Sequence, residues 1–154
     1  MDLSTILKPE AVRVITAASS KKRLLQEFGD LAESAYGLPA QPVVEALQER
    51  ENLGPTGVGH GVALPHARFD GLDRVVGAFI LLEKPVDFNS VDRQPIDVAF
   101  ALFAPEAAGV EHLKALARVS RQLREPAICA KLRANPDPAK LFMILTEADK
   151  VQAA

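Results

Sequence analysis

The chain has 154 residues, of which 48% are hydrophobic and 25% are charged, an ordinary balance for one globular domain with a sizeable core. A net charge of −2 and the lack of a basic stripe argue against nucleic acid as a partner. No apolar run is long enough to cross a bilayer, the N-terminus lacks a signal-peptide pattern, and the single cysteine, Cys129, excludes an internal disulfide. We therefore expect a cytoplasmic protein without membrane insertion, one domain over residues 1–154 with its core from about 5 to 147.

The N-terminal part of the chain predicts one strand followed by two helices. Residues 11–15 alternate between apolar and polar side chains, which is typical of a short strand. Apolar residues recur at helical spacing from about 19 to 36, and Gly37 is a stop signal for that helix. A second helix is predicted over residues 42–51, and it leads into a glycine-rich stretch.

The remainder predicts a buried sheet and further helices. Residues 62–64 indicate a strand, and the nearly unbroken apolar runs at 75–82 and 96–103 indicate strands buried on both faces. The segment 83–95 is polar and holds two prolines, so we expect a loop there. Three amphipathic helices are predicted after the last strand, over residues 110–124, 126–134 and 138–147. The fold class is therefore α/β, with a central sheet covered by helices on both faces.

The stretch from Gly54 to Ala67 is the most unusual part of the sequence. Four glycines in eight residues allow tight turns and a close approach to a ligand, and successive backbone N–H groups in such a turn favour an anion. His66 follows directly, after Pro65. A neutral imidazole is a good nucleophile near pH 7, because its unperturbed pKa is about 6.5. An imidazole beside an anion-binding loop suggests phosphoryl transfer.

Two other residues are candidates for the same chemistry. Arg50 lies near the end of a predicted helix, a few residues before the glycines, where its guanidinium could contact phosphoryl oxygens. His112 lies in the predicted first turn of a later helix, where it could hydrogen-bond the same group. Each also has a simpler interpretation: Arg50 as a solvated helix residue, His112 as a helix cap and His66 as a half-exposed loop residue.

Other kinds of site fit the sequence less well. Three histidines and several aspartates are suitable metal ligands, but His60 and His66 are six residues apart rather than four apart on one helix face. The glycines lack the Gly-Lys-Ser/Thr ending of a nucleotide-binding loop, and they precede a strand rather than a helix. We therefore expect no metal and no cofactor.

With these residues in view, the sequence resembles the type-2 IIA family of the bacterial phosphotransferase system, the fructose/mannitol class. The resemblance is greatest to the nitrogen-related branch of that family. It covers nearly the whole chain, in the order and spacing of the family. The segments that show it are Arg50-Glu51, Gly54–Gly59, Gly61–His66, Leu82–Phe88, Asp92–Asp97 and Glu111–Leu113.

The resemblance implies a mixed sheet between helices and a phosphorylated histidine. His66 would accept a phosphoryl group, through Nε2, from a small HPr-like carrier (NPr in the nitrogen branch), and Arg50 and His112 would line the site. Thr56 falls at a matching loop position, and with Gly57 and Gly59 it is expected to bind phosphate. In this branch, regulatory target proteins, including potassium-transport and stress-response regulators, respond to the phosphorylation state. In the alternative sugar branch, the phosphoryl group passes to a IIB domain during fructose- or mannitol-type uptake.

Two departures from the family pattern lie in the glycine-rich stretch. Pro55 replaces a small hydroxyl residue, which removes a possible loop donor. His60 stands where relatives often have asparagine, and its spacing suggests a second titratable group that tunes the pKa of His66. The donor protein must dock beside His66, and Phe69 and Leu72 are the predicted apolar rim of that docking surface.

Overall fold

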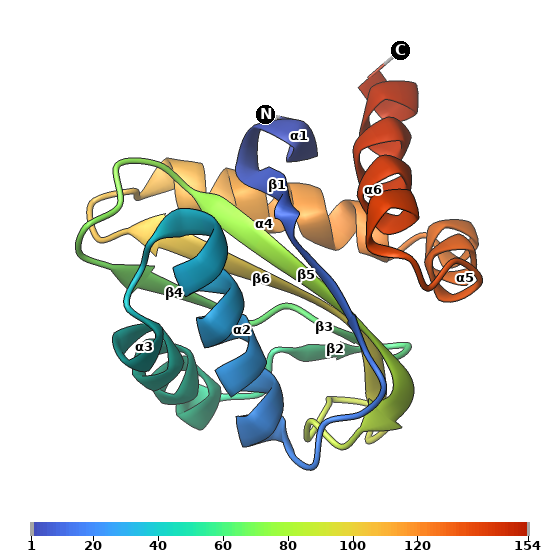
Figure 1. The fold of residues 1–154 in the computed structure, drawn as a ribbon, viewed down its shortest axis with the longest axis horizontal. Coiled ribbons are helices and arrows are strands. Elements are labelled where there is room, and N and C mark those ends of the chain that lie inside the picture. The colour runs from blue at the N-terminus through green and yellow to red at the C-terminus, as the bar shows by residue number, and fades with distance from the viewer. Residues whose placement is uncertain (1, 154) are drawn as a thin grey trace.

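The computed structural model describes the backbone of residues 2–153 and the side chains of residues 2–147. Within that part the chain forms one six-stranded sheet and six helices (Figure 1). In chain order the elements are α1 (Leu3–Ile6), β1 (Leu7–Ile15), α2 (Lys21–Tyr36), α3 (Ala40–Leu53), β2 (Gly57–Gly59), β3 (Val62–Ala63), β4 (His66–Phe69), β5 (Val76–Val86), β6 (Ile96–Pro105), α4 (Val110–Leu123), α5 (Pro126–Arg133) and α6 (Pro138–Ala153).

The sheet is mixed, as the family resemblance implied. Its strand order is β1-β5-β6-β3-β2, and β4 also pairs with β6. The two long apolar strands, β5 and β6, form an antiparallel centre, whereas β1 runs parallel to β5, and both β3 and β4 run parallel to β6. The near-continuous burial of β5 and β6 explains why their sequences lack a polar face.

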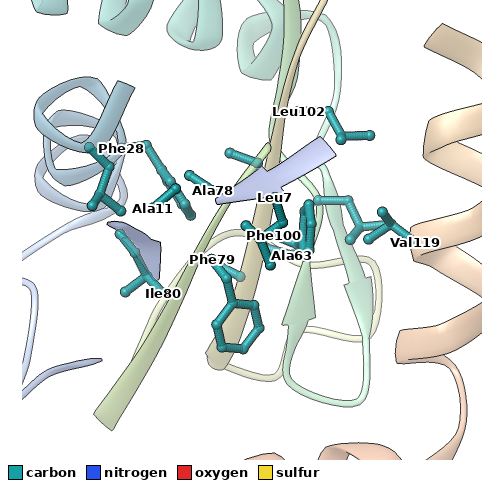
Figure 2. Packing of buried hydrophobic residues seen from close by; sticks show 14 of the residues in the cluster. Leu7, Ala11, Phe28, Ala63, Ala78, Phe79, Ile80, Phe100, Leu102 and Val119 are labelled. Carbon is teal, nitrogen blue, oxygen red and sulfur yellow. The ribbon is translucent and has the colours of Figure 1, made fainter. Parts of the chain in front are cut away.

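Helices cover both faces of this sheet, which confirms the predicted α/β class. Figure 2 shows Phe28 of α2 on one side of the strands and Val119 of α4 on the other, and both side chains are fully buried. The strands between them approach closely at Gly77, where a Cβ atom would lie 2.6 Å from the ring of Phe100. Helix α2 begins and ends where the sequence indicated: Ser20 accepts the Arg23 N–H, and Gly37 has a φ of 70°.

β1 and β5 each extend well beyond their predicted bounds, and each has a proline in its interior. β1 begins at Leu7 rather than residue 11, and β5 continues to Val86, so the predicted loop over 83–95 is wrong at its start. Pro9 lies between Leu7 and Val12, where the register of β1 on β5 shifts. Pro85 lies in the equivalent break between β5 and β6. A proline is tolerated at an irregularity of this kind because no ladder N–H is needed there.

The glycine-rich stretch contains two short strands: β3 confirms the strand predicted over residues 62–64, whereas β2 replaces part of the predicted loop. β2 and β3 form an antiparallel hairpin joined by His60 and Gly61, whose φ angles are 57° and 79°. Two residues with positive φ make the tight hairpin turn whose twist matches that of the flanking strands. Positive φ is uncommon for residues other than glycine, but asparagine, aspartate and histidine are enriched among the exceptions, so His60 is compatible with the first turn position.

Candidate functional site

His66 is the first residue of β4, at a break between two short strands that pair with β6. β3 lies beside Val98 and Ala99, and β4 begins beside Leu102. Pro65, in the break, accepts a hydrogen bond from the Leu102 N–H at 2.9 Å, so the main chain is held on the sheet on both sides of His66. The imidazole therefore stands on rigid backbone rather than on a loop, contrary to the simpler interpretation of the sequence.

The contacts of His66 define its tautomer. Arg50 donates from Nε to Nε2 of His66 at 3.3 Å, and a guanidinium can only donate, so Nε2 must be an acceptor. The proton of the neutral ring is then on Nδ1, which lies 2.8 Å from the Leu64 carbonyl oxygen and donates to it. Nε2 consequently carries the lone pair of the ring, which a nucleophilic nitrogen requires, and at rest that lone pair accepts the Arg50 hydrogen bond.

The surroundings keep this imidazole neutral. Burial lowers the pKa of His66 from its ordinary value of 6.5, and the nearby Arg50 charge lowers the pKa further. The Leu64 carbonyl and the Glu51 carboxylate act in the opposite direction and are outweighed. Near pH 7 the Nε2 lone pair is therefore available.

Arg50 is held by the end of its own helix. It lies in the last turn of α3, and Nη1 donates to the carbonyl oxygen of Gly54 at 2.9 Å, just beyond the helix. Because a guanidinium has five N–H groups, the contacts to Gly54 and His66 leave other N–H groups that could hold an anion. The structure thus brings two of the predicted residues, Arg50 and His66, into contact.

Thr56 contacts a buried carboxylate rather than the His66 pocket. Its backbone N–H and its hydroxyl both donate to Glu51, which is only 6% exposed. Glu51 also forms a 2.8 Å ion pair with Lys21 of α2, and Lys21 in turn lies over the ring of Phe88. This network fixes the start of the glycine-rich stretch to α2 and α3, directly beside Arg50.

His112 lies against His66 from another helix. It is in the first turn of α4, is 6% exposed, and its ring centroid is 5.5 Å from that of His66 in an edge-on arrangement. Burial, followed by the charges of His66 and Arg68, lowers the pKa of His112 from 6.5 to about 4. His112 is therefore neutral over the physiological range, as is His66.

Arg68 is a site residue that the sequence reasoning missed. It donates from Nε to Nδ1 of His112 at 3.3 Å. Arg68 is two residues beyond His66 on β4, so the two side chains share one face of the strand, while Ala67 and Phe69 point to the core. Alternation along residues 66–69 could have identified it, had this short strand been recognised.

An open pocket of about 610 Å³ unites these side chains. It is lined by Ala46, Glu49, Arg50, Asn52, Leu53, His66, Ala67, Arg68 and His112. Two arginines and two neutral imidazoles with hydrogen-bonding nitrogens suit a multiply charged anion such as a phosphoryl group. Among residues 2–147, no three His, Cys, Asp or Glu side chains gather in a group that could hold a metal ion.

Three predicted phosphate-binding residues do not line this pocket. Thr56 faces Glu51, and Gly57 and Gly59 belong to β2, where Gly57 packs against Ser90 and Gly59 lies near Asp92. The structure therefore separates these three residues from Arg50, His66 and His112, and their role in phosphate binding stays a prediction.

His60 also lies apart from His66. Its N–H donates to Asp92 at 2.9 Å and its carbonyl accepts from Arg133 at 2.9 Å, so its backbone links the hairpin to a loop and to α5. Burial, Leu64, Arg50 and Glu51 are the influences on the pKa of His66, and His60 is not one of them. The hypothesis that His60 tunes His66 gains no support.

The predicted apolar rim is wrong. Phe69 is 8% exposed and packs edge-on against Phe103, and Leu72 is half-buried against the core. The exposed apolar side chains beside the pocket come from helices instead. They are Leu53 at the end of α3, 85% exposed, with Val110 and Leu113 flanking His112 in α4, 62% and 63% exposed.

The fold and the pocket define a class: an α/β domain with a mixed sheet and an open pocket lined by two arginines and two histidines. The chain belongs to the EIIA 2 family of the phosphoenolpyruvate-dependent sugar phosphotransferase system, whose family model matches residues 5–148. The family predicted from the glycine-rich stretch and His66 is thereby confirmed.

Relatives within this family bear two kinds of name. A nitrogen regulatory protein of Bradyrhizobium diazoefficiens is 43% identical over 145 residues, which are 94% of this chain and 95% of the relative. The crystal structure of the nitrogen regulatory protein IIA-Ntr of Neisseria meningitidis is 36% identical with a TM-score of 0.87, over 94% of this chain and 99% of that one. A fructose-specific EIIA component of Haloferax volcanii is 32% identical, over 85% of this chain and 86% of the relative.

No helix in the part of the chain that the structure describes has both the length and the apolar character needed to cross a bilayer.

Proposed function

We propose that this protein is a phosphohistidine carrier of the nitrogen-related branch, and that His66 is the residue that accepts the phosphoryl group. The observation that supports this most directly is the tautomer of His66, because the Arg50 and Leu64 contacts leave the lone pair on Nε2. The names of the most similar relatives favour the nitrogen branch. The donor is an HPr-like carrier, the NPr of that branch.

The transfer is a displacement in line between two imidazoles. The P–N bond of the donor phosphohistidine breaks and its electron pair returns to the donor ring, while the Nε2 lone pair of His66 forms the new P–N bond. His66 keeps its Nδ1 proton. Donation of that proton to the Leu64 carbonyl stabilises the positive charge that the ring acquires.

Arg50 changes its hydrogen-bond partner during this reaction. Its Nε contact occupies the Nε2 lone pair of His66 at rest, so the guanidinium must turn its donors to the phosphoryl oxygens as the new bond forms. The Nη1 contact with Gly54 supplies a pivot for that movement. His112, 5.5 Å from His66 between ring centroids, is close enough to donate to another phosphoryl oxygen.

The donor docks on the exposed apolar residues beside the pocket. Leu53, Val110 and Leu113 lie on two helices that flank His66 and His112, and exposed apolar side chains around a charged centre are typical of a protein interface. Docking there would exclude water from the phosphoryl group during transfer.

We also propose that the protein acts in the cytoplasm through regulatory target proteins that respond to its phosphorylation state. Potassium-transport and stress-response regulators are the target classes that the family resemblance suggests. The phosphate-binding role of Thr56, Gly57 and Gly59 remains a separate prediction, which Thr56→Ser and Thr56→Val variants test.

A second candidate function is that of a sugar-specific IIA component. The likeness to the fructose-specific EIIA component of Haloferax volcanii is the observation that favours it. Incubation of the phosphorylated protein with a cognate IIB domain and sugar separates the two: transfer to the IIB cysteine with consumption of sugar supports the sugar branch, and a stable phosphoprotein supports the nitrogen branch.

Intact-mass spectrometry tests the proposed function. The protein is incubated with phosphoenolpyruvate, an enzyme-I-like protein and an HPr-like carrier, and the wild type is compared with His66→Ala. One acid-labile phosphoryl group that is lost in the variant is the expected result. His60→Asn is the matched control, because His60 is exposed in a hairpin turn that asparagine also adopts, and it should be fully modified. No modification by any carrier would refute the proposal.

A further inference from the structure

Arg68 and His112 form a second arginine–histidine contact beside the first. Arg68 Nε donates to His112 Nδ1 at 3.3 Å, and Arg68 Nη1 lies 3.5 Å from the carbonyl oxygen of Glu106. Both side chains line the pocket that contains His66. The role proposed above for His112 requires a hydrogen on the nitrogen that would meet the phosphoryl group, so the side chain that fixes its proton matters for the reaction.

The contact determines the tautomer of His112. An arginine has no acceptor, so Nδ1 of His112 must be unprotonated where Arg68 donates to it, and the single proton of the neutral ring is then on Nε2. This is the reverse of His66, where the proton is on Nδ1 and Nε2 is the acceptor.

Nε2 of His112 is an unsatisfied donor. It is buried and has no hydrogen-bond partner among the residues that the structure describes. Buried donors without partners are rare in folded proteins, and each one calls for an explanation. A phosphoryl oxygen on the neighbouring His66 would provide the missing acceptor.

We infer that Arg68 is a positioning residue that holds His112 in the Nε2–H tautomer, so that His112 donates a hydrogen bond to the phosphoryl group on His66. Arg68 acts through His112 and does not touch the phosphoryl group itself. This inference rests on the proposed function of His66. A neutral ring is sufficient for this role, because the one proton of His112 is already on Nε2.

The charged and titratable groups around His112 favour the same protonation state. Arg68 and His66 face it from β4, and Arg50 and Glu49 line the same pocket from α3. The Arg68 charge lowers the pKa of His112, although burial is the larger cause. Removal of the Arg68 charge should therefore raise the pKa of His112 toward 6.5.

A double-mutant cycle tests whether Arg68 acts through His112. The rate of phosphoryl transfer from the HPr-like carrier is measured for the wild type, Arg68→Met, His112→Asn and the double variant. We expect His112→Asn to slow transfer about 100-fold, as loss of one donor to a developing charge does, and Arg68→Met to slow it roughly 10-fold. The double variant should match His112→Asn within about twofold, since Arg68 then has no residue to position. If the double variant is instead slowed by the product of the two single effects, Arg68 acts independently of His112 and the inference is overturned.

Histidine NMR gives an independent readout that does not require phosphoryl transfer. In the wild type, ¹⁵N shifts should show His112 as the Nε2–H tautomer, with Nδ1 accepting a hydrogen bond. In Arg68→Met, the ¹⁵N shift of His112 Nδ1 should move toward the value of a nitrogen that accepts no hydrogen bond. The midpoint of the pH titration of His112 should rise. Unchanged shifts and an unchanged midpoint would overturn the inference even if transfer were slowed.

Two controls complete the design. Arg68→Lys keeps a charge and a donor but not the planar fork, so it should recover part of the NMR signature and part of the rate. Arg74→Met removes an arginine that contacts the Thr5 carbonyl outside the His66 pocket. This variant should change neither the NMR signature of His112 nor the rate of phosphoryl transfer. If the wild type accepts no phosphoryl group from any carrier, the proposed function fails, whereas the NMR titration still decides the link between Arg68 and His112.

Discussion

Two arginine–histidine pairs stand side by side in one pocket, and they make the same contact with opposite results. Arg50 donates through Nε to Nε2 of His66, and Arg68 donates through Nε to Nδ1 of His112. The first pair leaves a lone pair on Nε2, and the second leaves a hydrogen there. The choice of ring nitrogen therefore separates a nucleophile from a donor, although both residues are neutral histidines with lowered pKa values.

A backbone contact reinforces the difference that the two arginines make. His66 has a second contact, the Leu64 carbonyl at 2.8 Å, which takes the Nδ1 proton. His112 has no such carbonyl partner on Nε2 in the described part of the chain. The main-chain acceptor two residues upstream of His66 thus supports the tautomer that Arg50 favours, whereas only Arg68 fixes the proton of His112.

The largest expected effect comes from removing the nucleophile. In His66→Ala, no phosphoryl group should appear on the protein, because His112 has its proton on Nε2 and does not replace His66. Intact mass followed by peptide mapping at alkaline pH, where phosphohistidine survives, checks this. Modification of His112 in the variant would show that the two histidines are not distinct in role.

Arg50→Met is the next largest perturbation. Loss of a charged donor to the transferring group should slow phosphorylation by about 10²–10³-fold. The pKa of His66 should rise in the same variant, because the Arg50 charge lowers it. Quenched-flow mass spectrometry measures the rate and an NMR titration measures the pKa. A normal rate would mean that the Arg50 contact is only structural.

The apolar residues beside the pocket should have smaller effects. Leu53→Ser and Leu113→Ser should each lower the second-order rate constant roughly fivefold, which corresponds to about 1 kcal/mol of binding free energy. Met143→Ser is the matched control, since Met143 is similarly exposed at 53% but lies on α6. If the second-order rate constant falls no more than in the control, Leu53 and Leu113 are not part of the donor interface. Thermal unfolding should be nearly unchanged in all three.

The last expected effect is on stability at acid pH and does not involve the rate of transfer. The pKa of His112 is about 4 in the folded protein and near 6.5 when unfolded, so between these values the unfolded chain binds more protons. The free energy of unfolding should therefore fall as the pH falls from 6.5 toward 4, and His66 contributes in the same direction. Urea unfolding at several pH values measures this, and the free energy of unfolding should depend less on pH for His112→Asn than for the wild type. Parallel curves would contradict the lowered pKa.

Long periodic elements were predictable from the sequence, and short ones were not. Helices α2 to α5 and the apolar strands β5 and β6 follow from 3.6-residue spacing and from unbroken apolar runs. β2 and β4 have three and four residues, too few for a period to show, and the glycines of β2 resemble a loop. β3 is the exception among the short strands, because its apolar run predicted a strand over residues 62–64. His60-Gly61 is a hairpin-turn signal between β2 and β3. It was overlooked because the glycines were interpreted as an anion-binding loop.

The errors at the site follow from those missed strands. Once β4 is known, alternation places Arg68 on the same face as His66 and turns Phe69 toward the core. Arg68 had no predicted role, and Phe69 had been predicted to lie on the surface. The resemblance to a family identified Arg50, His66 and His112, whose meeting point depends on chain segments that no local pattern connects. The hydrogen bonds of the two histidine rings depend on where the atoms lie to within a few tenths of an ångström, and no sequence pattern contains that information.

The break at Pro65 separates β3 from β4 and sets where His66 lies on the sheet. It places the reactive nitrogen on the sheet, whereas α3 and α4 supply the exposed apolar side chains beside it. An engineer could therefore exchange helix surface residues to redirect the protein to a different donor, while leaving the nucleophile and its proton untouched. The proposed nucleophile and the proposed docking residues lie on different elements, so substitutions can test them separately.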